Sequence, residues 1–411
     1  MEFFNISKKE KSITGLINIT GSKSESNRLL ILKKIYKNKI ILKNISDSED
    51  TKILKKSLYN NEKIININHA GTAMRFLTAY FSSEEGKNVI LTGSSRMKNR
   101  PIKILVDTLN NMGAKIEYLE KDGFPPIRII GKKLKGGKVK INSNVSSQYI
   151  SAIMLIAPKL EEKLEIKLLG KITSYPYINM TLQILKKIGI YVKEKDRKIV
   201  LFPKKDIKKL NFCIESDWSS ASYYYSLCTF SENCNLYLKM YKKKSLQGDM
   251  YVHKIYENYF GIKTIFHNDY IFLHKKKYHK YPKFLELDLN YTPDIAQTIV
   301  VTCAGLKIKC IIKGLETLKI KETDRLKGLK NELLKIGIKS NINKDSIEIV
   351  SYKEYNNKKI CINTYKDHRM AMSFSTLGIL YPIKIFDPKV VKKSYKNFWE
   401  DMEKIGFDIK K

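Results

Sequence analysis

The sequence predicts an α/β protein built from six similar units, grouped as two lobes of three. The main observation is a repeated pattern in which a helical segment ends in an apolar residue, then a glycine, then a strand. It occurs as NNMGAKI, KKIGIYV, NYFGIKT, LKIGIKS and EKIGFDI, with glycines at Gly113, Gly189, Gly261, Gly337 and Gly406, a period of about 70 residues. Glycine suits the left-handed cap of a helix, so each copy is expected to read helix, turn and strand.

The second observation is helical spacing before these glycines. In RPIKILVDTLNNMG the apolar residues Ile102, Leu105, Leu109 and Met112 fall on one helical face, and Pro101 fits a first turn. The segment ETDRLKGLKNELLKIG repeats the arrangement. A sixth unit is expected near residues 40–60, where SLYNNEKI resembles a copy that has lost its glycine.

Length and composition are those of a folded protein, with 411 residues, 43% hydrophobic and 10% aromatic. No apolar run approaches the roughly 18 residues of a membrane span, and MEFFNISKKEKS becomes charged before a signal-peptide core could form, so we expect a cytoplasmic protein with no membrane partner. The cysteines form no C-x-x-C pair, so we expect buried free thiols and neither a zinc site nor a disulfide framework. They are Cys213, Cys228, Cys234, Cys303, Cys310 and Cys361.

The formal net charge of +36 raises the alternative of a nucleic-acid-binding protein, because a basic surface attracts polyanions. Only eight of the 77 basic residues are arginines, while Ile, Asn and Tyr are plentiful. This composition indicates drift toward A/T-rich codons, which adds lysine over the whole surface. A nucleic-acid-binding protein gathers Lys and Arg on one face, so no specific nucleic-acid partner is expected.

The scarcity of arginine makes its positions informative, because a guanidinium grips carboxylate or phosphate with a planar fork that lysine lacks. All but Arg197 lie in short segments flanked by glycine, serine or acidic residues; these are Arg28, Arg75, Arg96, Arg100, Arg128, Arg325 and Arg369. The alternative is a structural salt-bridge anchor, which we consider for Arg100 and Arg128.

The segment GSKSESNR, residues 21–28, is a candidate anion site. Its small residues precede a helix-like run and would expose backbone N–H groups, to which Lys23, Ser24 and Arg28 add donors. It lacks the G-x-x-x-x-G-K-[ST] order of a nucleotide P-loop. An ordinary serine-rich turn is the other interpretation of this segment taken alone.

Ten motifs occur in the order GSKSESNR, NHAGTAMRFL, LTGSSRMKNRPI, VSSQYISAIM, SYPYINMT, ESDWSSASY, YTPDIAQT, IKETDRL, YKDHRMAM and DPKVVKKSY. Together they resemble the 5-enolpyruvylshikimate-3-phosphate (EPSP) synthase family from about residue 14 to the C-terminus. The resemblance implies the inside-out enolpyruvyl transferase fold, with six βαβαββ repeats in two lobes. We place residues 16–214 in the N-terminal lobe, and residues 1–15 with 215–411 in the C-terminal lobe.

The resemblance also implies a function, which is transfer of the enolpyruvyl group of phosphoenolpyruvate to the 5-hydroxyl of shikimate 3-phosphate through a tetrahedral intermediate. It further implies a monomer that needs no metal or organic cofactor. Both substrates are multiply anionic, so cations and oriented donors must offset their repulsion. Lobe closure on shikimate 3-phosphate is expected to assemble the arginines.

The resemblance assigns residues to each substrate. Phosphoenolpyruvate is expected to contact Lys23, His69, Gly71, Arg96, Gln148, Arg325, Arg369 and Lys393. Shikimate 3-phosphate is expected to contact Lys23, Ser24, Arg28, Ser146, Ser147, Gln148, Ser174, Tyr177, Asp294 and Lys321. Ser146 and Ser147 head an apolar helix, where a serine is also an ordinary N-cap.

Two carboxylates and a lysine are the implied catalytic groups. Asp294 is the candidate base at the 5-hydroxyl, Glu322 the candidate acid and base at the methylene carbon, and Lys23 could share either proton step. Without the motifs, Asp294 and Glu322 would be read as residues that stabilise a helix dipole. Asp324 and Asp367 are expected to orient adjacent arginines, and His368 to be a packed residue at a helix start.

The sequence departs from the family pattern at several places. His69 stands where the family usually has asparagine, and residues 51–69 are shorter than usual. Phe76 stands where the family often has proline, which leaves open the sensitivity to glyphosate, a competitor of phosphoenolpyruvate in this family. UDP-N-acetylglucosamine enolpyruvyl transferase is the alternative enzyme, but its loop cysteine is missing from GSSRM.

Overall fold

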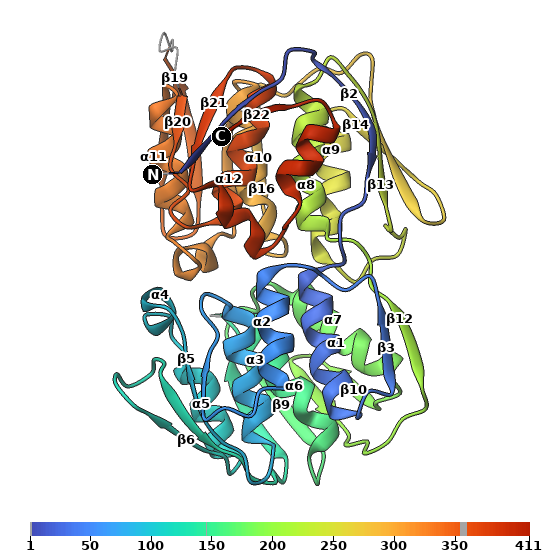
Figure 1. The fold of residues 1–411 in the computed structure, drawn as a ribbon, viewed down its shortest axis with the longest axis vertical. Helices are drawn as coiled ribbons and strands as arrows, with labels where there is room; N and C mark the ends of the chain where they lie inside the picture. The colour runs from blue at the N-terminus through green and yellow to red at the C-terminus, as the bar shows by residue number, and fades with distance from the viewer. Residues whose placement is uncertain (1, 145, 354–359) are drawn as a thin grey trace. The chain divides into compact units, whose positions relative to one another are not determined.

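The computed structural model describes residues 2–144, 146–353 and 360–411. The chain forms two compact units, residues 22–214 and residues 1–21 with 215–411 (Figure 1). The first boundary between the units lies after Gly21 rather than after residue 15, because strand β2 (Ser12–Ile17) pairs along its length with β13 (Asn233–Lys239). The second boundary lies at Glu215.

The helices and strands of residues 22–214 follow one another without long gaps. They are α1 Lys23–Ile35, β3 Ile40–Lys43, α2 Glu49–Leu58, β4 Ile64–Asn66, α3 Gly71–Ser82, β5 Asn88–Thr92, α4 Ser95–Lys98, α5 Lys103–Asn111, β6 Lys115–Tyr118, β7 Ile127–Ile130, β8 Gly137–Asn142, α6 Ser147–Ile156, β9 Leu164–Leu169, α7 Tyr175–Lys187, β10 Val192–Lys195, β11 Lys198–Leu201 and β12 Leu210–Cys213.

The other unit combines the N-terminal segment with the second half of the chain. Its elements are β1 Phe3–Ser7, β2, α8 Trp218–Phe230, β13, α9 Val252–Tyr259, β14 Ile262–Phe266, β15 Tyr270–Lys275, β16 Phe284–Asp288, η3 Pro293–Ile295, α10 Ala296–Gly305, β17 Lys309–Lys313, η4 Glu316–Ile320, α11 Arg325–Lys335, β18 Ile338–Ile342, β19 Ile347–Tyr352, β20 Ile360–Ile362, α12 His368–Ser375, β21 Ile383–Phe386, η6 Pro388–Lys393, α13 Phe398–Lys404 and β22 Asp408–Lys410.

Five of the six sheets formed by the described residues repeat one topology. In β4-β5-β7-β6 the first pair is parallel and the other two are antiparallel, and the same order occurs in β8-β9-β11-β10, β2-β13-β15-β14, β16-β17-β19-β18 and β20-β21-β1-β22. The last of these sheets is completed by β1, which comes from the opposite end of the chain. A parallel two-stranded sheet, β3-β12, is the sixth. The predicted fold class, with three repeats in each unit, is confirmed.

The glycines behave as predicted. Each of the five follows a helix with φ between 71° and 94° and precedes a strand. Two details differ: Pro101 lies before the N-cap Ile102 of α5, and SLYNNEKI ends α2 but leads into β4, which starts the next sheet. The cap of α2 is Tyr59 with φ −112°, so no glycine is needed there.

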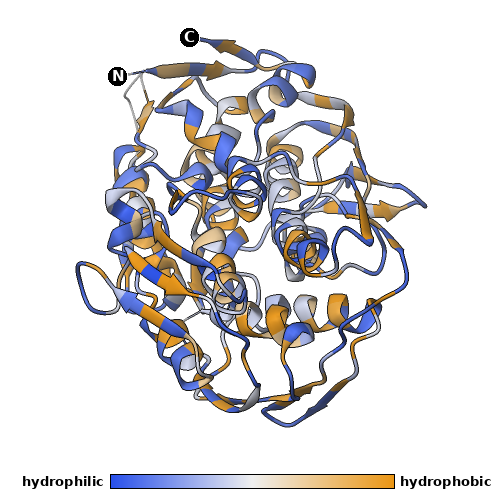
Figure 2. Ribbon diagram, turned by 60° about the horizontal axis from the view of Figure 1, so that its bottom comes forward, coloured by the Kyte–Doolittle hydropathy of each residue, from blue (hydrophilic) through white to orange (hydrophobic). Residues whose placement is uncertain are grey.

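Buried helices form the core of each unit. The helices α6, α8 and α10 carry no charged residue and are buried almost throughout, so they can be surrounded by protein on every side. Outer strands such as β13 alternate buried and exposed residues, as expected for a sheet with one solvated face. Figure 2 shows hydrophobic residues on the helices and strands and hydrophilic residues in most of the loops.

The cysteine expectation is partly wrong. Cys228 and Cys234 form a disulfide, because the end of α8 and the start of β13 bring their Cα atoms to 5.3 Å. Their separation of six residues matches no motif used above. Cys303 and Cys310 are buried free thiols as expected, but Cys213 is exposed.

Gly113 offers a test of the repeat. Its φ is 94° and an added Cβ would meet no atom within 4 Å, so the backbone conformation alone opposes substitution. Gly113→Ala is expected to lower the free energy of unfolding by about 1 kcal/mol, and Gly113→Asn by less, since asparagine tolerates this region better. Urea unfolding measures both. An alanine variant as stable as the parent would contradict the assignment.

Candidate functional site

A buried ion-pair cluster lies in the unit of residues 215–411, centred on Arg325. Its side chain is 2% exposed and donates to three carboxylates, from Nε to Asp367 at 2.8 Å, from Nη1 to Asp294 at 3.1 Å, and from Nη2 to Glu322 at 2.9 Å. Burial alone would lower the pKa of Arg325, but these three carboxylates raise it above its usual value. The arginine is therefore a permanent cation that holds three acidic groups together.

Three further cations contact the same carboxylates. Lys393 Nζ lies 2.9 Å from Glu322 Oε1, and Arg369 Nη2 lies 3.0 Å from Asp294 Oδ2. Lys321 Nζ is 4.0 Å from Asp294 Oδ1. The structure thus brings together every residue of this unit that the sequence assigned to a substrate.

The starts of three helices position this cluster. Asp294 lies in η3, which continues into α10, and Glu322 lies just before α11. Asp367 caps α12 by accepting a bond from the backbone N–H of Arg369 at 2.8 Å. Short polar residues cap helices, and backbone N–H groups there favour anions, so acidic and anion-binding residues share these sites.

Asp249 joins the cluster and was not predicted. It is buried, its Oδ2 accepts a bond from Ser219 Oγ, and Ser219 also accepts a bond from Arg369 at 3.4 Å. Burial and the nearby charge of Asp294 raise the pKa of Asp249 to about 7. The Oδ1 atom has no hydrogen-bond partner among the described residues. No sequence pattern used above marks Asp249. Its place in the cluster is visible only because the segment QGDM packs against α8 in the folded chain.

Arg28 is the central residue of a second cluster, in residues 22–214. Its guanidinium is bound only by neutral oxygens, with Nε 2.7 Å from Thr181 Oγ1 and Nη2 3.0 Å from both Ser151 Oγ and the carbonyl of Tyr177. Burial lowers its pKa to about 10. Among the described residues no carboxylate pairs with Arg28, so its charge is available to an anionic ligand.

Several predicted residues lie at helix starts near Arg28. Ser146 caps α6 by accepting from the N–H of Gln148, whose Nε2 donates to Thr72 Oγ1 at 3.2 Å. Ser147 is buried in the first turn of α6, and Ser174 has a left-handed conformation, φ 54°, at the start of α7. The N-cap alternative for this serine pair is therefore confirmed for Ser146.

The remaining predicted residues of this unit are more exposed. Lys23 Nζ lies 3.4 Å from Asp50 Oδ2, in the first turn of α1. Arg96 is exposed in α4, and His69 is exposed with Nδ1 2.7 Å from Ser94 Oγ. Gly71 starts α3, where the residue that packs on it is Arg100.

Three structural roles differ from the expectation. Arg100 and Arg128 form no ion pair within the described parts of the chain, and Arg128 Nε donates to Asn88 instead. Asp324 caps α11 rather than orienting an arginine, accepting from two backbone N–H groups. His368 is buried at the start of α12, as expected.

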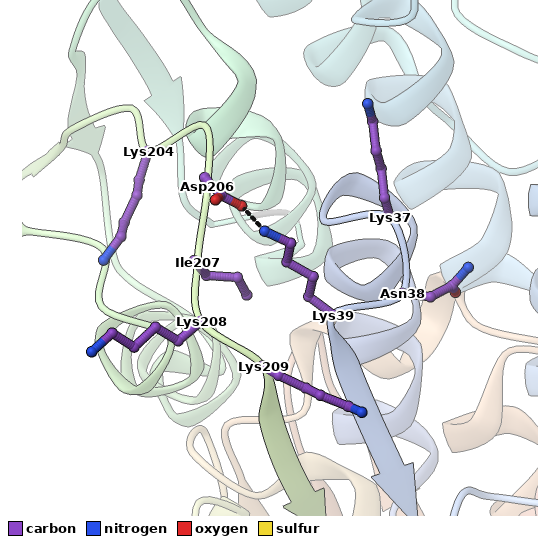
Figure 3. A pocket seen from close by; sticks show the side chains of 8 residues that line it. All are labelled: Lys37, Asn38, Lys39, Lys204, Asp206, Ile207, Lys208 and Lys209. Atoms are coloured by element: carbon purple, nitrogen blue, oxygen red, sulfur yellow. Dashed lines mark hydrogen bonds and ion pairs between the residues drawn. The ribbon is translucent and has the colours of Figure 1, made fainter.

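The net charge is carried largely by lysines away from these clusters. A cavity of about 710 Å³ lies beside the start of β3. In Figure 3 the side chain of Lys39, which lines this cavity, points to Asp206 and forms an ion pair with it. It is lined by Lys37, Asn38, Lys39, Lys204, Asp206, Ile207, Lys208 and Lys209. The cavity contains no arginine and no residue assigned to a substrate. Within the described residues no cluster of three or more His, Cys, Asp or Glu could hold a metal, and no helix could cross a membrane.

Comparison with known proteins places the chain in a family. Residues 53–402 match the family model of EPSP synthase (3-phosphoshikimate 1-carboxyvinyltransferase). The chain belongs to the EPSP synthase family. A relative from Bacteroides fragilis (strain YCH46), named 3-phosphoshikimate 1-carboxyvinyltransferase, is 43% identical over 402 residues, 97% of each chain. A relative of the same name from Mannheimia haemolytica is 33% identical over 426 residues, 96% of this chain and 97% of that one.

Solved structures support the fold of the family. EPSP synthase from Acinetobacter baumannii superposes with a TM-score of 0.76 over 100% of both chains, at 21% sequence identity. The relatives carry the name of the shikimate enzyme, which favours it over the sugar-nucleotide alternative.

The raised pKa of Asp249 predicts a pH dependence. The pKa of Asp249 is about 7 in the folded protein and 3.8 in the unfolded chain. The folded state therefore binds more protons than the unfolded state between these pH values, and the protein loses stability as the pH rises through this window. Asp249→Asn removes this titration, and its Tm relative to the parent is expected to rise from pH 5 to pH 8. The exposed Asp196→Asn is the control. A difference in Tm that stays constant with pH would exclude a raised pKa.

Proposed function

We propose that this protein transfers the enolpyruvyl group of phosphoenolpyruvate to the 5-hydroxyl of shikimate 3-phosphate, a step of the shikimate pathway that leads to chorismate and aromatic amino acids. The products are 5-enolpyruvylshikimate 3-phosphate and phosphate. The observation that carries the proposal is 43% identity, along 97% of the chain, to a protein named for this reaction. The ion-pair cluster around Arg325 supports it, because it supplies cations and carboxylates together.

The cations of the cluster are proposed to hold phosphoenolpyruvate. Arg325, Arg369 and Lys393 are each paired with a carboxylate in the structure, within 3.1 Å. The carboxylate and phosphate of phosphoenolpyruvate compete for the same donors, and a planar guanidinium binds either in two-point fashion. Cations from several segments offset the repulsion between the two anionic substrates.

The carboxylates are proposed to move protons. Asp294 accepts the proton of the 5-hydroxyl as its oxygen attacks C2 of phosphoenolpyruvate, and Glu322 gives a proton to the methylene carbon, which forms the tetrahedral intermediate. Glu322 then removes a proton from the new methyl group as the C–O bond to phosphate breaks, and the proton that Asp294 took from the hydroxyl passes to the released phosphate or to solvent. Lys23 is proposed to assist either transfer. Arg325 orients both carboxylates, since it bonds to one oxygen of each.

Shikimate 3-phosphate is proposed to bind Arg28, which has no acidic partner among the described residues. The serines at the starts of α6 and α7 add donors close to it in the fold. The full proposed set is Lys23, Ser24, Arg28, Ser146, Ser147, Gln148, Ser174, Tyr177, Asp294 and Lys321. For phosphoenolpyruvate it is Lys23, His69, Gly71, Arg96, Gln148, Arg325, Arg369 and Lys393.

Monomeric state and cytoplasmic location belong to the same proposal. The formal net charge of +36 supports a monomer, because like-charged surfaces repel one another. Light scattering during size-exclusion chromatography measures the mass directly, and one chain corresponds to 47.8 kDa.

Phosphate release with alternative acceptors tests the function. The purified protein is supplied with phosphoenolpyruvate and either shikimate 3-phosphate or UDP-N-acetylglucosamine, and released phosphate is measured. Release with shikimate 3-phosphate alone is expected, accompanied by the mass of the enolpyruvyl product. Release with the sugar nucleotide alone would assign the alternative reaction, and no release with either acceptor would contradict the proposal.

A further inference from the structure

Arg100 is packed against the first residue of α3. It lies between α4 and α5, and the residue is only 8% exposed. A Cβ added to Gly71 would lie 2.4 Å from Nη1 of Arg100 and 2.9 Å from its Cζ. The guanidinium therefore occupies the space that any other side chain at position 71 would need.

The charge of this buried guanidinium is uncompensated. Its Nε is buried without a hydrogen-bond partner, and no ion pair or side-chain hydrogen bond of Arg100 occurs in the parts of the chain that the structure describes. Arg325, also buried, binds three carboxylates, and Arg28 binds four oxygens. Burial of a cation without an opposite charge is unfavourable, so an anion bound beside Arg100 would stabilise it.

The start of α3 also favours a negatively charged group. This helix has 12 residues, no side-chain cap at Ala70 and no acidic residue in its first turn. The first backbone N–H groups of a helix have no partner within it and favour negative charge. The guanidinium of Arg100 and these N–H groups thus lie together at Gly71. No acidic residue in the first turn of α3 offsets their positive charge.

We propose that Arg100 is a further substrate-binding residue, which together with the first turn of α3 takes a carboxylate or phosphate group of phosphoenolpyruvate. This inference rests on the proposed function, and it adds a residue that the resemblance did not assign. Thr72, in the same turn, is hydrogen-bonded to Gln148, one of the residues proposed to contact phosphoenolpyruvate. The role of Gly71 is then to let the guanidinium approach the helix start.

Substitution of Arg100 tests the inference. Arg100→Lys keeps the charge but loses the fork, and Arg100→Gln removes the charge; Arg128→Lys, on the exposed side of β7, is the matched control. Both Arg100 variants are expected to raise the KM for phosphoenolpyruvate by about tenfold or more, the usual effect of losing a charge-assisted hydrogen bond. The KM for shikimate 3-phosphate is expected to change less than about twofold in all three variants.

A second measurement does not depend on turnover. Inorganic phosphate is expected to raise the Tm of the parent and of Arg128→Lys more than that of either Arg100 variant. If the parent releases no phosphate from phosphoenolpyruvate, the proposed function fails and this Tm comparison alone decides whether Arg100 binds anions. If the parent is active, an unchanged KM for phosphoenolpyruvate in Arg100→Lys and Arg100→Gln overturns the inference.

Discussion

The buried guanidinium of Arg325 is the interaction on which the arrangement of its unit depends. The side chain of Arg325 is 2% exposed, and its charge is matched by three carboxylates from three different chain segments. Those segments are the starts of α10, α11 and α12. Truncation of Arg325 would leave the buried carboxylate of Asp367 without this cationic partner, at a cost of about 3–5 kcal/mol. The ion pairs that position the carboxylates proposed to be catalytic therefore also stabilise the fold.

The two units satisfy their buried arginines in different ways. Arg325 is neutralised by carboxylates, whereas Arg28 is bound by hydroxyl and carbonyl oxygens that leave its charge in place. Among the described residues, the side chain of Arg100 forms no ion pair and its buried Nε has no hydrogen-bond partner. This difference suits the proposed reaction between two anions, because arginines without an acidic partner can attract an anionic substrate, while Arg325 fixes the orientation of its carboxylates.

Local chemistry explains what could be predicted from sequence. A glycine directly after an amphipathic helix predicts a left-handed helix cap, so Gly113 and its four equivalents indicated where the repeats lie. The rare arginines of this lysine-rich chain indicated the residues at the centre of both clusters. The rest depends on contacts between distant segments. The pairing of β1 with β21 and β22, the closeness of Cys228 to Cys234 and the burial of Asp249 have no local signal. From the sequence alone Arg100 could be a salt-bridge anchor. That it has no acidic partner among the described residues is visible only in the three-dimensional structure.

The central claim is that Glu322, oriented by Arg325, carries the proton to and from the methylene carbon. The most direct measurement is turnover of Glu322→Gln, which keeps a hydrogen-bond acceptor for Arg325 but cannot exchange a proton. The half-buried Glu316→Gln is the control, and Tm shows whether each variant is folded. We expect kcat to fall by about 10²–10⁴-fold in Glu322→Gln and to stay unchanged in the control. Near-normal turnover in a folded Glu322→Gln variant would contradict the account.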